Sequence, residues 1–260
     1  MYATNLDGKL TTVMKILFFV LICVMISGCS YLNSMLEAEP ADDSGFIQNP
    51  EQMKPDRSRF PFDRVWCQGD GCDWRKYSSV VVKPVDTDHV LKMSWWDNFT
   101  LESISELQEE RHIIAKYLRE KTISEIKNDP DKHHEVVDVA RNDSMIIEFA
   151  LVELVPTKVF MRAVADFAGY IIPGAQVLGL TGSGSVAIEG RIRDAETGEV
   201  IFKFADREQD QTSIANIKDL TWHGHANVVV DVWVREFVEL YDTPPTHLVE
   251  ASDHFTLKVW

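Results

Sequence analysis

Hydrophobic and polar residues alternate most regularly along two runs, residues 185–193 and residues 200–207. Such alternation is typical of strands that bury one face and expose the other. Between the runs, residues 194–198 read Asp-Ala-Glu-Thr-Gly, a composition typical of a turn. The pattern predicts an antiparallel hairpin with one apolar and one charged face, on which we expect cross-strand ion pairs such as Glu189 with Lys203.

Six further segments show the pattern of strands or helices. One segment is apolar on both alternating sets, as in a central strand that is covered on both faces. Another opens with a capping box and ends before Pro130. The predicted strands are 79–85, 144–155 and 255–259, and the predicted helices are 103–128, 159–171 and 222–240. Their order predicts an α/β (α+β) fold, a mixed sheet that contains the hairpin and has helices packed against it.

The N-terminal region has the features of a secretion signal. Residues 16–26 form an apolar run after Lys15, too short for a bilayer span but suited to the centre of a signal peptide. The run ends in Ile-Ser-Gly-Cys at 26–29, which resembles the lipobox of bacterial lipoproteins. The resemblance implies that residues 1–28 are removed and that Cys29 becomes a lipidated N-terminus. The alternative is an ordinary signal peptide with a chance cysteine at its end.

Two details refine this interpretation. Met14 precedes Lys15 and is a better start for a signal peptide than Met1, so we expect translation to begin there. The residue after Cys29 is Ser30 and not aspartate, which in the sorting rule of such lipoproteins favours the outer membrane over the inner membrane.

The segment that follows the lipobox differs in composition from the rest. Residues 29–62 are rich in Pro, Asp, Glu, Ser, Asn and Gln and contain few large apolar side chains after Leu36. Such a segment cannot bury enough apolar surface to order itself. The composition therefore predicts a flexible tether at 29–62, followed by a single α/β domain at 63–260.

Charge narrows the choice of partners. The chain has 41 Asp and Glu residues against 26 Lys and Arg residues, a formal net charge of −15. This charge repels the phosphates of nucleic acids and of anionic lipid headgroups. We therefore expect no nucleic-acid partner and no direct binding to anionic headgroups.

Two cysteines remain once Cys23 leaves with the signal and Cys29 is lipidated. Cys67 and Cys72 enclose four residues with a Gly-x-Gly sequence. In an oxidising compartment this pair is most simply a short-loop disulfide. A metal site would need further ligands, and a redox pair more often has two residues between its cysteines.

Several sequence segments resemble the uncharacterised bacterial lipoprotein family known as DUF3313. The resemblance lies in the hairpin at 184–200, with its core Ser-Val-Ala-Ile-Glu-Gly-Arg-Ile-Arg-Asp, and in residues 154–157, 205–207 and 222–226. It covers roughly residues 77–260. No activity is assigned to this family, so the resemblance does not imply a particular reaction. The order of elements is also similar to lipoprotein domains of the TolB N-terminal and LpoB kind, an analogy of fold alone.

The candidates for chemistry are few. His223 and His225 could begin a metal site if a carboxylate such as Asp206 or Asp219 completed it. Histidines two residues apart on a helix point in different directions, so the sequence favours no metal and no other cofactor. The glycine-rich residues 181–185 lack the spacing and the lysine of a phosphate-binding loop. The motifs Gly-x-Ser-x-Gly and His-Glu-x-x-His are absent.

The sequence thus favours a lipoprotein anchored in the outer membrane and facing the periplasm. It would act as a binding or assembly module, without catalysis, on an envelope protein or a cell-wall component. The alternative is a periplasmic hydrolase, metal-dependent or of another kind, that uses His223, His225 and Asp206.

Overall fold

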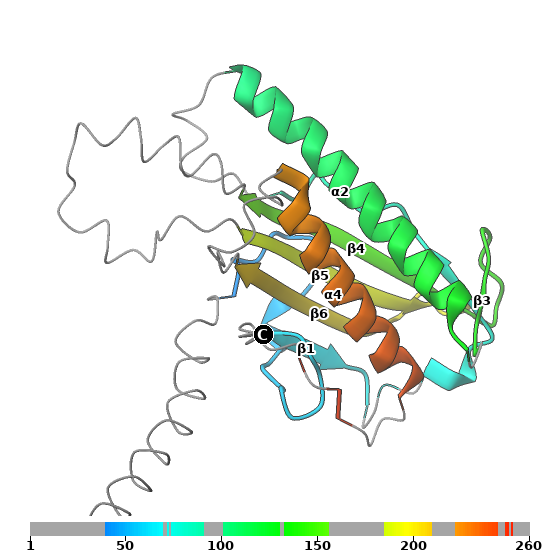
Figure 1. The fold of residues 1–260 in the computed structure, drawn as a ribbon. Coiled ribbons are helices and arrows are strands. Elements are labelled where there is room, and N and C mark those ends of the chain that lie inside the picture. Colours follow the sequence, from blue (N-terminus) through cyan, green and yellow to red (C-terminus); the bar gives the residue numbers. More distant parts are fainter. Residues whose placement is uncertain are drawn as a thin grey trace, which may run out of the picture. The chain divides into compact units, whose positions relative to one another are not determined.

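The computed structural model describes residues 40–69, 72, 74–90, 101–130, 133–155, 185–209, 222–243, 248–249 and 251. These residues form the helices α2 (Leu101–Asn128) and α4 (Trp222–Asp242), the 3-10 turns η1 (Pro50–Gln52) and η2 (Trp74–Lys76), and the strands β1 (Arg64–Cys67), β2 (Ser79–Val82), β3 (Glu135–Val136), β4 (Ser144–Val155), β5 (Ser185–Asp194) and β6 (Val200–Gln209). Figure 1 shows their arrangement.

The strands form one mixed sheet in the order β1-β6-β5-β4-β2-β3. β2 runs parallel to both β3 and β4, whereas β4, β5, β6 and β1 pair antiparallel in succession. The predicted hairpin is confirmed as β5 and β6. At its turn, Asp194 Oδ1 accepts hydrogen bonds from the backbone amides of Glu196 and Thr197, both at 2.9 Å, and Gly198 adopts a φ of 72°. That φ is in the left-handed region, which glycine adopts without strain.

Both helices lie on the same face of the sheet (Figure 1). The side chains of β4, β5 and β6 that point to this face are large and apolar, and they pack against α4 around the fully buried Trp233. Burying a large side chain of this kind contributes about 1.5–3 kcal/mol. The space beneath Trp233, lined by Phe62, Phe149 and Phe204 among others, has no room for a water molecule. This face is therefore a closely packed core.

The opposite face, called here the outer face, is covered by residues 41–54, which we name the strap loop. Both ends of the loop contact β1. Arg64 Nη2 donates to Ala41 O at 3.3 Å, and Lys54 and Val65 exchange two backbone hydrogen bonds of 2.9 Å. Between these ends, Phe46 contacts the ring of His89, beyond the far end of β2. The loop thus crosses the sheet and returns, with its ends close together as in an Ω-loop.

The strap loop corrects the predicted tether. The sequence assigned this segment to a flexible linker. Three of its side chains, Phe46, Ile47 and Met53, are buried against the outer face. Two more, Phe60 and Phe62, are buried in the main core. The prediction is therefore wrong for residues 40–62, which belong to the folded domain. Five scattered apolar side chains are enough to order this polar segment, because the sheet offers a surface that buries them.

The other predicted elements divide into three groups. Those at 79–85, 103–128, 144–155 and 222–240 are confirmed as β2, α2, β4 and α4. β1 and β3 were not predicted. The predicted helix 159–171 and strand 255–259 lie outside the described residues. Among the described helices, neither is long and apolar enough to cross a membrane.

Candidate functional site

The outer face holds two buried charges whose hydrogen bonds go to the strap loop. Glu189 in β5 is 1% exposed and accepts from Ser44, through Oγ at 2.6 Å and the backbone amide at 3.3 Å. Lys203 in β6 donates from Nζ to Gln48 O and to Gln52 Oε1, both at 2.7 Å. Burial lowers the pKa of Lys203. The loop therefore supplies the partners that these charges need away from water.

The expected ion pair between Glu189 and Lys203 is not formed. In the β5–β6 register Glu189 lies opposite Ala205, and Lys203 lies opposite Arg191. Two ion pairs of this face join β5 to β4, because Glu148 Oε2 accepts from Arg191 Nε at 2.6 Å and from Arg193 Nε at 2.8 Å. A third joins β6 to β4, from Arg207 Nε to Glu153 Oε1 at 2.9 Å. Burial acts to raise the pKa of Glu148, but the hydrogen bonds from the two guanidinium groups leave this pKa below its usual value.

Small side chains make room for the strap loop. Ala150 and Val152 of β4, Ala187 of β5 and Ala205 of β6 form a shallow floor on the outer face, and Phe46, Ile47 and Met53 pack on it. The guanidinium carbon of Arg191 lies 4.3 Å from the centre of the Phe46 ring, and its Nη1 donates to Phe46 O at 2.9 Å. We call this floor, together with Glu189, Arg191 and Lys203, the strap groove. It binds an irregular segment through apolar side chains and main-chain atoms together.

A second cluster closes the junction between the N-terminal segment, β6 and α4. Asp206 Oδ1 accepts from the backbone amide of Asp63 at 2.8 Å, and Asp63 Oδ2 accepts from the backbone amide of Arg207 at 3.0 Å. The other oxygen of Asp206 accepts from Trp233 Nε1 at 2.6 Å. Each carboxylate thus satisfies the backbone of the other segment, and Asp206 also fixes the indole of the central core residue.

Burial raises the pKa of Asp206 well above its usual value, and the nearby charges of Asp63 and Glu208 raise it further. The hydrogen bonds from Trp233 and from the Asp63 amide act in the opposite direction. A perturbed carboxyl of this kind is often found in active sites, but structural networks produce the same shift. Here the two oxygens point to a backbone amide and to an indole in a core without free space, which indicates a structural role.

The proposed metal ligands are placed only in part. His223 and His225 lie in the first turn of α4, and their side chains are outside the described residues. The described part of the chain holds no group of three or more His, Cys, Asp or Glu side chains that could bind a metal ion. The hydrolase that would use these histidines with Asp206 therefore stays a prediction. The glycine-rich residues 181–184 also lie outside the described part.

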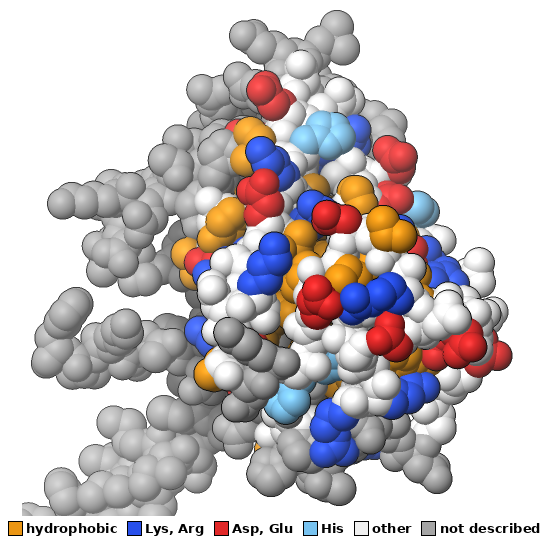
Figure 2. Space-filling model, turned by 90° about the vertical axis from the view of Figure 1, so that its right-hand side faces the viewer, with side chains coloured by type: hydrophobic (Ala, Val, Ile, Leu, Met, Phe, Trp, Pro, Cys, Tyr) orange, Lys and Arg blue, Asp and Glu red, His pale blue; other side chains and the backbone are white. Residues whose placement is uncertain are grey.

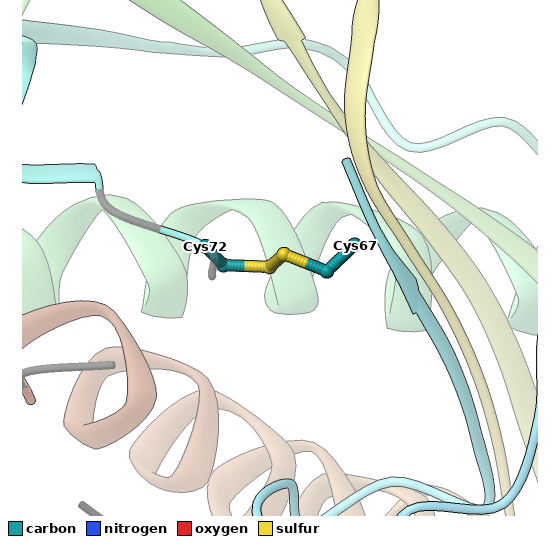
Figure 3. Close-up of a disulfide and its surroundings, with 2 residues drawn as sticks. All are labelled: Cys67 and Cys72. Atoms are coloured by element: carbon teal, nitrogen blue, oxygen red, sulfur yellow. A yellow bond between two sulfur atoms is a disulfide. The ribbon is translucent and has the colours of Figure 1, made fainter. Parts of the chain in front are cut away.

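Cys67 and Cys72 form a disulfide, as Figure 3 shows. Cys67 ends β1, and the two Cα atoms are 5.8 Å apart. Cys72 is buried beside Trp74, whose ring contacts Phe202 of β6 at 5.1 Å. The bond therefore ties the end of β1 into the core, which favours the structural interpretation over a redox role.

Charges of both signs cover the side of the molecule drawn in Figure 2. Lys and Arg side chains alternate there with Asp and Glu, and hydrophobic side chains lie between them. No large area of one charge is seen on this side. The net negative charge of the chain is thus not gathered here into a single acidic patch.

The fold and the groove define a class of protein, an α/β domain whose N-terminal loop occupies a groove on its own sheet. Residues 42–237, which are 196 of the 260 residues, match the family described as "Protein of unknown function (DUF3313)". The chain belongs to this family. The match begins within the strap loop, so the loop is part of the family's domain.

Solved structures offer only distant likenesses. A variant of the PelC dodecamer from Paraburkholderia phytofirmans is 7% identical, with a TM-score of 0.36 over 69% of this chain and 98% of that one. The hypothetical protein CT253 from Chlamydia trachomatis is 8% identical, with a TM-score of 0.33 over 63% of this chain and 97% of that one. The resemblance to TolB N-terminal and LpoB domains is not confirmed. No curated protein matches the sequence significantly.

Proposed function

We propose that this protein is a lipoprotein of the outer membrane that faces the periplasm and serves as a binding or assembly module. The observation that carries the proposal is the strap loop. The described fold begins soon after the predicted lipid site, because only ten residues separate Cys29 from Pro40. A fully extended segment of that length spans about 40 Å at most. A lipid on Cys29 would therefore hold the domain close to the bilayer.

The groove supports binding over catalysis. Its charged side chains are arranged to hold main-chain atoms of a polypeptide, through Arg191 to Phe46 O and Lys203 to Gln48 O. Its floor of alanines fits apolar side chains. These are the elements of a surface that recognises a segment of protein. An envelope protein is accordingly the partner that we propose.

The anchor is tested by labelling cells with radioactive palmitate. We compare the wild type with Cys29→Ser, and the matched control is Cys23→Ser, which removes a thiol of the predicted leader. We expect label on the wild type and on Cys23→Ser but not on Cys29→Ser, with the labelled protein in the outer-membrane fraction. Label on Cys29→Ser, or an unlabelled wild-type protein that keeps its leader, would contradict the proposal.

A further inference from the structure

Residues 133–143, which we call the edge segment, contain β3 and lie at one edge of the sheet (Figure 1). The backbone amides of Glu135 and Val137 donate to Ser78 O and Val80 O at 3.0 Å and 2.9 Å. Every side chain of the segment is exposed or half-buried except that of His134, which is 6% exposed. His134 is therefore the one side chain that anchors the edge segment inside the domain.

The surroundings of His134 accommodate a neutral imidazole. Nε2 lies 3.1 Å from Trp74 O in η2, and it must carry the proton because a carbonyl oxygen only accepts. Nδ1 is buried without a hydrogen-bond partner among the described residues. The ring packs on that of Tyr241 in the last turn of α4, with the ring centres 4.2 Å apart. A second proton, on Nδ1, would place a charge and an unpaired donor inside the domain, which is unfavourable.

The groups around the imidazole do not compensate for such a charge. Burial lowers the pKa of His134, and the hydrogen bond to Trp74 O opposes this effect only in part. Two ionisable neighbours act in opposite directions, because His133 lowers this pKa further and Asp129, which follows α2, raises it. From α4, Tyr241 contributes the face of its ring. Protonation therefore favours a state in which the imidazole reaches water.

We propose that His134 is an acid-sensitive latch, which holds the edge segment against η2 and α4 at neutral pH and releases it when the imidazole takes up a proton. Release moves the Glu135 and Val137 amides away from Ser78 O and Val80 O, so β2 becomes an exposed edge of the sheet. Exposed edges pair readily with strands of other chains. Each pH unit below about 6.5, the usual pKa of histidine, favours the open state by up to about tenfold. The latch does not depend on the lipid anchor.

The test measures amide hydrogen exchange of the full chain in detergent at about pH 7.5 and about pH 5, corrected for the pH dependence of exchange in an unfolded chain. In the wild type we expect the protection of the Glu135 and Val137 amides to fall about tenfold at the lower pH. In His134→Gln the side-chain amide can still donate to Trp74 O but does not titrate, so this fall should be absent. The matched control is His133→Gln, at the neighbouring exposed position, which should behave like the wild type.

Low concentrations of urea separate local release from unfolding of the whole domain. Protection of the Glu135 and Val137 amides should not change with urea, whereas protection of the β5 and β6 amides should decrease with it. Circular dichroism checks that each variant is folded, and His134→Phe, which keeps a ring beside Tyr241, replaces His134→Gln if that variant is not. Unchanged protection in the wild type, or an equal fall in the wild type and the folded variant, overturns the latch. It is also overturned if the edge segment depends on urea as steeply as β5 and β6.

Discussion

Gly190→Ala should destabilise the domain, although replacing glycine in a strand usually does the opposite. Gly190 in β5 lies opposite Phe204 in β6. A Cβ atom on residue 190 would lie 2.2 Å from Cε1 and 2.3 Å from Cζ of Phe204. The Phe204 ring is 1% exposed and is held by the rings of Phe62 and Phe237, whose centres are 4.3 Å and 5.9 Å away. The ring therefore has little freedom to move aside.

Two opposing effects set the size of the change. Reduced freedom of the unfolded chain favours alanine by about 0.4–1 kcal/mol. Overpacking of a closely packed core costs about 1–3 kcal/mol. The steric effect is the larger one, so we expect a net loss of about 1–2 kcal/mol in the free energy of unfolding. For a domain of this size the melting temperature should fall by about 2–8 °C.

The free energy is measured by urea unfolding, followed by tryptophan fluorescence. Phe204→Leu provides the control, because a smaller side chain at residue 204 removes the clash. In the double variant, Gly190→Ala should cost clearly less than it does alone, and a double-mutant cycle measures this difference. If Gly190→Ala is as stable as the wild type or more stable, the close contact between Gly190 and Phe204 is refuted.

Three further predictions concern stability. The pKa of Asp206 is raised in the folded state, so the stability that it contributes should be present below its unfolded pKa of about 4 and be lost as pH rises from there toward the raised pKa. Urea unfolding at several pH values should show a smaller loss of stability for Asp206→Asn than for the wild type. An equal dependence of stability on pH in the two proteins would contradict this. Burial, opposed in part by the hydrogen bond to Trp74 O, lowers the pKa of His134, so the free energy of unfolding should fall as pH drops below about 6.5. The variant His134→Phe should not show this fall. The variant His133→Phe, at an exposed position, should still show it. Reducing the disulfide, or replacing Cys67 by Ser, should lower the free energy of unfolding by about 2 kcal/mol according to the loop-entropy relation. The loss is measured as a lower melting temperature. An equal melting temperature with and without reductant would contradict this.

The regular elements could be predicted because their periodicity depends on local sequence. The hairpin strands alternate apolar and polar residues, whereas β4 is apolar on both alternating sets, and these strands appear where their patterns predicted them. β1 was not predicted, because its four residues, Arg-Val-Trp-Cys, are too few to establish a period. β3 has only two residues.

The candidate site could not be predicted, because it depends on pairing between distant segments. Sequence reasoning identified Glu189 and Lys203 as charged residues of one face but placed them opposite each other. The actual register pairs Lys203 with Arg191, two residues further along β5. The register shifts between Ile192 and Arg193, and the alternation of side chains in the two strands does not predict that shift. Asp206 was also noticed, but its partner Trp233 is 27 residues away in α4 and its partner Asp63 is 143 residues away.

The strap loop changes what a lipid on Cys29 would do. With a domain starting at residue 63, the 33 residues after the anchor could reach about 120 Å, far from the bilayer. With the fold starting near Pro40, the same relation gives about 40 Å. A partner of the strap groove would then have to lie close to the membrane. Any pull between anchor and domain would also act first on the strap loop, since the loop follows the anchor in the chain. The anchor and the fold would therefore be coupled, because tension on the anchor would reach the sheet through the strap loop.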